Sequence, residues 1–399
     1  MSELGEFFHR SLAQTSEAPI GLEISRAEGS WLVASDGRRY LDFIAGIGVS
    51  ALGHGNPEVL DAIAAQARRH LHVMVYGEYV IESQAMLARR LVELLPRPLE
   101  RVYFTNSGAE AIECALKVAR KFTDRAGFVA FEGAYHGDTM GALALCGNRA
   151  MREPFGALPG PVRHLPFDDV GALEKIDSTI AAVVVEPVQA EGGVRIPETG
   201  FIRALRERCD RAGAMLIFDE VLTGFGRTGT MFALEHFGVV PDILVMAKAL
   251  GGGLPLGALC SRDELLGTLS HDPPLGHITT FGGHPLSCAA GLAAVNVIVR
   301  ERLYERAATI GKEIVRRLLA MRAPEIMAVR GLGMLVGIEF RDAALTRRFV
   351  AATLARGVIV NWTLNADNVV RLAPVLTITP DEVDFALSAM NKALDEIRR

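Results

Sequence analysis

Three short stretches of the sequence hold residue types that can do chemistry together. Ser107-Gly108 follow the apolar run RVYFTN and precede a helical pattern that begins near Ala109, so backbone N–H groups at a helix N-terminus can hold one phosphate. Lys248 ends the apolar run DILVMA, where partial burial would disfavour the ammonium form and make the amine nucleophilic. Asp219 ends the run MLIF, and a buried carboxylate there needs a cationic partner.

Taken one at a time, these features have ordinary explanations. The serine can simply cap the helix, and the lysine can lie at the surface with its stem on apolar neighbours. Together they supply a phosphate anchor, an amine that can form an imine, and a carboxylate for a cationic ring nitrogen. Pyridoxal 5'-phosphate requires all three, so the combination predicts this cofactor.

A competing motif lies in the same part of the chain. The segment GFGRTG, from Gly224 to Gly229, matches the dinucleotide-binding pattern G-x-G-x-x-G. That pattern normally leads directly into a helix, with an acid about twenty residues further on. Here a short segment broken by Pro241 follows the glycines, and the acids Asp219 and Glu220 precede them. We expect the glycines to shape a loop, and a dinucleotide-dependent oxidoreductase is a remote alternative.

Alternating strands and helices are expected to position these residues. Between about residues 100 and 265, apolar runs alternate with segments of helical period, which predicts an α/β fold with a mostly parallel sheet covered by helices. Ligands of such sheets bind beyond the carboxyl ends of the strands. The polar residues expected there are Ser107, His136, Glu186, Asp219 and Lys248. The runs predicted as strands are RVYFTN, GFVAFEG, AAVVVEPV, AMLIFDEV, DILVMAK and LGALCSR.

The sequence pattern outside this region predicts how the rest of the chain is divided into domains. We expect residues 1–55 to pack with a small C-terminal domain, residues 56–295 to form the large domain, and residues 296–399 to form the smaller α+β domain. Asp36-Gly37 predicts a hairpin turn. One long helical segment is expected over 286–322, before short strands and a final helix from residue 381.

Composition narrows the class of partner. The 399 residues are 50% hydrophobic with a formal charge of -5, which favours a globular protein and small-molecule partners over nucleic acid or an anionic membrane. Five scattered cysteines without a C-x-x-C pair and an amino end without an apolar signal core indicate a cytoplasmic protein. His70 and His72 lack further ligands at metal-like spacing, so we expect a helix end and no metal site.

With these motifs in order, the chain resembles the class III pyridoxal-phosphate-dependent aminotransferases of fold type I, of the ornithine and acetylornithine type. The resemblance implies a homodimer with shared active sites and a large-domain sheet of the seven-stranded type. It implies a ping-pong reaction through the pyridoxal and pyridoxamine forms of the cofactor. The amino group would pass from an amino acid or ω-amino donor, like ornithine, acetylornithine, lysine or 4-aminobutyrate, to an oxo acid, with 2-oxoglutarate expected. The matching motifs are YLDFIAGIGVSALGH, FTNSGAEA, FEGAYHGDT, EPVQAEGG, FDEVLTGFGRTG, KALGGGLPLG, TTFGGHPLSCAAGLA and VVRLAPVLTIT.

The resemblance also implies roles for individual residues. Lys248 corresponds to the lysine that joins the cofactor and moves the substrate proton, and Asp219 to the aspartate that keeps the ring nitrogen protonated. Tyr135 and Val221 correspond to the residues on the two faces of the ring, and Gln189 to the group near its phenolic oxygen. The remaining expected cofactor-binding residues are Ser107, Gly108 and Ala109 in the phosphate turn, Glu186 at a strand end, and Thr280, which reaches the cofactor of the other subunit.

Three residues bear on the substrate. Arg371 matches the arginine that holds the α-carboxylate of glutamate or 2-oxoglutarate. Glu191 matches the glutamate that neutralises this arginine and swings aside for the oxo acid, although a static ion pair is the alternative. Asp138 stands where related enzymes usually carry an arginine for a distal carboxylate. It can receive a cationic donor group, or it can cap the helix before Thr139.

Two alternatives on the same fold remain open. An aminomutase or racemase would keep the lysine and aspartate but need no second oxo-acid substrate. A binding protein without catalytic activity is disfavoured by the presence of both Lys248 and Asp219.

Overall fold

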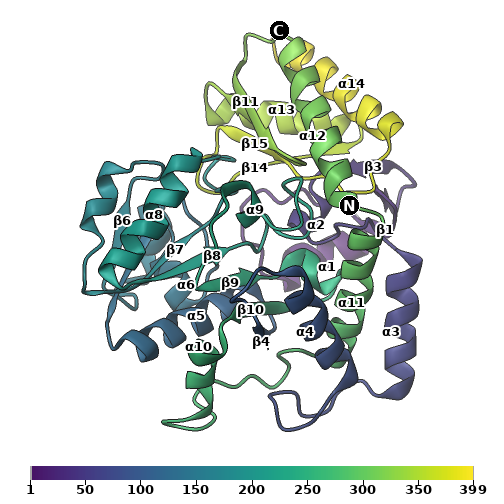
Figure 1. Cartoon of the computed structure of the whole chain (residues 1–399). Coiled ribbons are helices and arrows are strands. Elements are labelled where there is room, and N and C mark those ends of the chain that lie inside the picture. Colours follow the sequence, from purple (N-terminus) through teal and green to yellow (C-terminus); the bar gives the residue numbers. More distant parts are fainter. Residues whose placement is uncertain (1, 399) are drawn as a thin grey trace.

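A seven-stranded sheet forms the centre of the molecule (Figure 1). The computed structural model describes residues 2–398. Strand β10 runs antiparallel to both of its neighbours, and the other neighbouring pairs are parallel, which confirms the mostly parallel sheet. In sheet order the strands are β4 (Arg101–Thr105), β10 (Gly257–Ser261), β9 (Ile243–Met246), β8 (Met215–Asp219), β7 (Ile180–Val185), β5 (Gly127–Phe131) and β6 (Val162–Leu165).

Successive residues of the central strands enter two different apolar clusters. In β8, Leu216 and Phe218 belong to one cluster while Ile217 belongs to the other. Both faces of the sheet are therefore buried, which explains the unbroken apolar runs in the sequence. Edge strand β6 has the sequence VRHL and only one buried residue, so its polar pattern gave no strand signal and we did not predict it.

Helices cover the sheet on both faces. Helix α5 (Gly108–Thr123) contacts β7, β9 and β10, and α11 (Pro285–Arg300) packs against α3 (Pro57–Arg69) and α4 (Glu82–Leu94). Helix α3 has His70 as its C-cap, as expected. The other elements of residues 1–270 outside the sheets are α1 (Glu3–Ser11), α2 (Ala45–Gly48), α6 (Met140–Ala144), α7 (Arg149–Arg152), η1 (Glu153–Phe155), η2 (Gly171–Lys175), α8 (Thr199–Ala212), α9 (Leu234–Phe237), η3 (Lys248–Gly251), α10 (Asp263–Gly267) and η4 (Thr268–Ser270).

Two smaller sheets lie beside the central one. The first has the order β1 (Ile24–Glu28), β2 (Trp31–Ala34), β3 (Arg39–Asp42), β13 (Val358–Ile359), so it joins the two ends of the chain. The second has the order β11 (Ile326–Leu332), β12 (Leu335–Phe340), β15 (Val369–Leu372), β14 (Asn361–Trp362). Helices α12 (Leu303–Ala320), α13 (Ala343–Ala355) and α14 (Pro380–Ile397) lie with this sheet at the top of Figure 1. The domain boundaries expected from the sequence remain a prediction.

The sequence pattern predicted one hairpin turn correctly and one helix incorrectly. The Asp36-Gly37 hairpin is confirmed, with β2 and β3 paired antiparallel. The prediction of a single helix over 286–322 is wrong. Helix α11 ends at Arg300, and a second helix, α12, begins after Arg302, whose backbone is left-handed (φ 51°). A helical period on both sides of the break hides it from pattern analysis.

The cysteines are buried. Burial is the main reason why the pKa of the Cys209 thiol rises to about 12. All five cysteines are free and buried. Among residues 2–398, no helix is both long and apolar enough to span a bilayer.

Candidate active site

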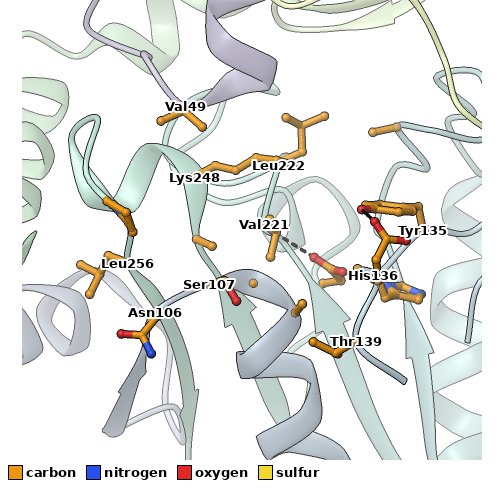
Figure 2. Close-up of a pocket in the computed structure, with 18 of the residues that line it drawn as sticks. Val49, Asn106, Ser107, Tyr135, His136, Thr139, Val221, Leu222, Lys248 and Leu256 are labelled. Atoms are coloured by element: carbon orange, nitrogen blue, oxygen red, sulfur yellow. Dashed lines mark hydrogen bonds and ion pairs between the residues drawn. The ribbon is translucent and has the colours of Figure 1, made fainter. Parts of the chain in front are cut away.

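A cavity of about 660 Å³ lies at the carboxyl ends of the central strands. Its walls include residues from the ends of β4, β5, β7, β8 and β9, as expected for an open α/β sheet. Figure 2 shows Lys248 extending across this cavity toward Leu222, with Ser107 and Tyr135 on other walls. The predicted residues that line it are Ser107, Gly108, Ala109, Tyr135, His136, Asp138, Glu186, Glu191, Asp219, Val221 and Lys248.

The phosphate turn is built from the N-terminus of α5. Ser107 is the N-cap, and its hydroxyl oxygen accepts a hydrogen bond from the Glu110 N–H at 3.2 Å. The serine is therefore a cap and a cavity residue at once. Gly108 has no room for a side chain, because a Cβ there would lie 2.8 Å from Cγ2 of Val221. The turn and Val221, two residues after Asp219, are thus packed directly together.

Asp219 ends β8 with its carboxylate buried. One oxygen accepts from the Val221 N–H at 3.0 Å, and the other lies 2.7 Å from Nδ1 of His136. Burial disfavours the imidazolium, but the hydrogen bond and charge of Asp219 outweigh it and raise the pKa of His136. The pair gives the buried Asp219 carboxylate a hydrogen-bond partner from a distant segment, on the oxygen that the Val221 N–H does not contact. We expected His136 at a strand end but did not predict this pairing, because 83 residues separate the two.

Lys248 begins the turn η3 directly after β9. Its backbone is left-handed (φ 47°), a conformation that costs about 1–2 kcal/mol in a residue with a Cβ. Such strain is concentrated at functional sites. Burial, and next the charge of Arg371, lower the pKa of the Lys248 ammonium. The amine is therefore more readily neutral than an exposed lysine, as the sequence predicted.

Glu186 has an unusual ionisation. Its carboxylate oxygens accept hydrogen bonds from the N–H groups of Tyr135 at 3.1 Å and Ala190 at 2.9 Å. Burial nevertheless dominates and raises the pKa of Glu186 to about 7. Near neutral pH this acid is only partly charged.

Asp138 lies exposed at the cavity wall beside Tyr135. The Tyr135 hydroxyl donates to its carboxylate at 2.7 Å (Figure 2). The helix-cap alternative is wrong, since Thr139 is the N-cap of α6 and no side chain caps that helix. Asp138 thus faces the cavity with only a neutral partner.

Arg371 and Glu191 form an ion pair. Arg371, on β15, is 1% exposed and does not line the cavity, whereas Glu191 does. Burial raises the pKa of Glu191, but the charge and hydrogen bond of Arg371 and the N–H of Leu364 outweigh it, so the pKa lies below its ordinary value. Glu191 therefore separates the buried guanidinium from the cavity.

Besides Arg371, two predicted residues, Gln189 and Thr280, do not line the cavity of this chain. Gln189 is fully buried, and its amide nitrogen donates to the Glu132 carbonyl at 2.9 Å. Thr280 is exposed. A residue that serves the other subunit, as Thr280 was expected to do, need not line its own chain's cavity.

The glycine motif forms a loop, as predicted. Residues 224–228 make successive turns and residues 229–231 make bends, and the next helix, α9, has only four residues. At Gly229 the backbone has φ 98°, and a Cβ would lie 3.0 Å from the Cβ of Ala308 on α12. The loop packs on that helix and does not present a helix N-terminus to a phosphate. The alternative hypothesis that this motif binds a dinucleotide is therefore wrong.

Comparison with known proteins agrees with this geometry. The sequence profile named "Aminotransferase class-III" matches residues 12–394, nearly the whole chain. The chain belongs to the class III aminotransferases. It is therefore a pyridoxal 5'-phosphate-dependent aminotransferase of fold type I, and the prediction of both cofactor and reaction class is confirmed.

The relatives that this chain matches are named aminotransferases or transaminases. This class III aminotransferase is 46% identical to an acetylornithine aminotransferase from Methanopyrus kandleri, over 92% of each chain. It is 42% identical to one from Methanosarcina mazei, over 93% of this chain and 91% of the relative. Among solved structures, an ornithine aminotransferase from Toxoplasma gondii matches with a TM-score of 0.91 and 31% identity over 99% of this chain and 96% of that one. An (S)-enantioselective omega-transaminase from Thermomicrobium roseum matches with a TM-score of 0.92 and 34% identity, over 99% and 98%.

Proposed function

We propose that this aminotransferase moves the amino group of an amino acid or ω-amino donor to an oxo acid, with 2-oxoglutarate as acceptor, in two half-reactions. The proposal rests on one observation, which is that three predicted groups line the same cavity. The phosphate turn at Ser107, the carboxylate of Asp219 and the amine of Lys248 all line it.

The residues present fit pyridoxal phosphate. Free N–H groups at the N-terminus of the 16-residue helix α5 suit its phosphate, and the buried Asp219 suits its ring nitrogen. When bound, the cofactor supplies an electron sink for the charge that develops on the substrate carbon. Lys248 would take a proton from that carbon and return it; its position in the cavity and the lowered pKa of its ammonium support this role. Asp219 keeps the ring nitrogen protonated, and the His136 hydrogen bond orients its carboxylate.

Other predicted cofactor contacts belong to the same proposal. Tyr135 and Val221 line the cavity and are available to contact the two faces of the ring, and Gly108, Ala109 and Glu186 line it as well. The role of Gln189 near the phenolic oxygen requires its side chain to approach the cavity from its present partner, the Glu132 carbonyl. Its second amide atom, Oε1, is buried without a partner among the described residues.

We also propose a homodimer with shared active sites. Exposed apolar side chains lie in the segments around Thr280, including Ile278 and Phe281, which are 48% and 54% exposed. Val80, 98% exposed, lies in another such segment. Exposed apolar surface of this kind is typical of an interface between chains. The five free cysteines support the cytoplasmic location that we expect.

For the acceptor half-reaction we propose that Glu191 acts as a switch. While it pairs with Arg371, the guanidinium is neutralised and a donor without an α-carboxylate in that place can bind. When an oxo acid enters, its carboxylate replaces that of Glu191 at Arg371. The position of Glu191 between the cavity and Arg371 supports this role.

Asp138 bears on which amino donors the cavity accepts. Among the acids of the cavity, Glu191 pairs with Arg371, Asp219 with His136, and Glu186 is only partly charged. Asp138 and Glu186 both lack a cationic partner among the described residues, but only Asp138 is exposed at the cavity wall, where it accepts from a neutral hydroxyl. We therefore propose that it favours donors whose far end carries an amine or a neutral group over donors with a distal carboxylate there.

A panel of donors assayed with 2-oxoglutarate tests this proposal. We expect diamines and basic amino acids to exceed 4-aminobutyrate in kcat/KM, and Asp138→Arg to shift the preference toward 4-aminobutyrate. Asp61→Arg, on the exposed side of α3, is the matched charge-reversal control and should leave the order of donors unchanged. An unchanged order in Asp138→Arg would remove Asp138 from the donor site. Sustained conversion of a donor without any oxo acid would instead indicate an aminomutase or racemase.

A further inference from the structure

The carboxylate of Glu191 has two hydrogen-bond donors from different segments. One oxygen pairs with Nη1 of Arg371 on β15. The other accepts from the backbone N–H of Leu364 at 2.9 Å, in the turn between β14 and β15. Since Glu191 lines the cavity, its carboxylate occupies a two-donor carboxylate site at the cavity wall.

Departure of Glu191 would leave both donors without an acceptor. Arg371 is almost completely buried, and a buried guanidinium that loses its paired acid is strongly destabilised. A freed N–H group also loses a charge-assisted bond. An incoming carboxylate has two oxygens in the same geometry as those of Glu191, so it can restore both interactions at once.

The Asn365 side chain ties the turn that carries the Leu364 N–H to the segment before Tyr135. The Asn365 side-chain amide donates to the carbonyls of Gly133 at 3.2 Å and Ala134 at 3.0 Å, just before Tyr135. The Asn365 backbone N–H donates to the Glu191 carbonyl at 2.9 Å. The turn is thus fastened to the end of β5 and to the Glu191 backbone, so the Leu364 N–H keeps its position when the Glu191 side chain moves.

We propose that the Leu364 N–H is the second donor of the oxo-acid carboxylate subsite, beside Arg371, and that Asn365 is the residue that positions it. This inference rests on the proposed switch of Glu191. The subsite recognises a carboxylate on the carbon next to the reacting carbonyl, so it acts on oxo acids and not on acceptors that lack this group. Loss of one charge-assisted hydrogen bond corresponds to about a tenfold change in affinity.

Steady-state kinetics with two acceptors test the subsite, using the holoenzyme with one fixed donor. Asn365→Ala, which releases the turn, and Leu364→Pro, which deletes the N–H itself, are expected to raise the KM for 2-oxoglutarate about tenfold with little change in kcat. The KM for butanal, an acceptor with no carboxylate, should stay within twofold in both variants. Asn368→Ala is the matched control, because Asn368 lies in the same turn but its side chain donates to the Phe340 carbonyl at 3.2 Å. It should change neither KM.

The possible failures are distinguishable. Equal increases in KM for both acceptors would mean that the turn only supports the structure, and would overturn the inference. An unchanged KM for 2-oxoglutarate in whichever variant folds would overturn it as well, while leaving the aminotransferase proposal intact. A wild-type enzyme that converts butanal but not 2-oxoglutarate would refute the proposed acceptor, and this inference with it.

Discussion

Replacing Glu191 with glutamine removes the only acid that pairs with the buried Arg371 among residues 2–398. The Glu191 side chain is 13% exposed and that of Arg371 is 2% exposed, so solvent screens the pair weakly. Leaving one charge of a buried pair without its partner costs about 3–5 kcal/mol. We expect the lower end of this range, because the glutamine amide oxygen can still accept one hydrogen bond.

The change in melting temperature follows from the size of the chain. At about 2.1 cal/mol/K per residue, the entropy of unfolding of 399 residues is roughly 0.8 kcal/mol/K. A loss of about 3 kcal/mol therefore lowers Tm by about 4 °C. Differential scanning calorimetry of wild type and Glu191→Gln at one protein concentration and scan rate measures this difference. Glu58→Gln, which removes the acid of a half-exposed pair with Arg300, is the control and should shift Tm much less.

The same experiment has a defined pH dependence. The pKa of Glu191 in the folded protein lies below its ordinary value of 4.5. Its ionised form therefore stabilises the folded state above about pH 4.5, and this contribution is lost as the pH falls through the folded-state pKa. The Tm difference between wild type and Glu191→Gln should be constant from pH 7 to about 5 and shrink below that. A difference under 1 °C at pH 7, or one that grows on acidification, would refute the reasoning.

Three further predictions concern the cavity and its supports. Gly108→Ala places a Cβ against Val221 and should weaken pyridoxal phosphate binding in a titration of the apoenzyme, whereas Gly200→Ala, with open space around it, should not. Unchanged affinity in Gly108→Ala would contradict the close approach at the phosphate turn. Asp219→Asn should keep the cofactor but slow both half-reactions about 10²–10³-fold in stopped-flow measurements, and a loss below tenfold would argue against its electrostatic role. Burial raises the pKa of Glu220 to about 7, so the folded wild type gains stability from this group as the pH falls from 7 toward 4.5. Glu220→Gln lacks this gain, so the Tm advantage of wild type over the variant should widen across that window; a constant difference would contradict the raised pKa.

The central sheet and the chemistry at its edge could be read from the sequence because their signals are local. Strands buried on both faces appear as unbroken apolar runs, and Ser107, Asp219 and Lys248 each follow one of them. Strand β6 has no such run, and the break at Arg302 lies inside a continuous helical period.

What the sequence could not show are contacts between distant segments. His136 beside Asp219, and the Leu364 N–H beside Glu191, join residues 83 and 173 positions apart. A backbone N–H carries no signature in the residue type, so only the fold reveals it as a donor. The placement of Gln189 shows the opposite problem: its position in a motif suggested a cavity residue, but its side chain donates to the Glu132 carbonyl outside the cavity lining.

The most direct test of the central claim is the cofactor and single-turnover behaviour of Lys248→Ala. Wild-type protein should bind one pyridoxal phosphate per chain, show the visible absorbance of the lysine-bound cofactor, and convert one donor per site when no oxo acid is present. Lys248→Ala should lose that absorbance band and the turnover while retaining its fold by circular dichroism. A variant that keeps both the band and the single turnover would show that another residue performs this chemistry.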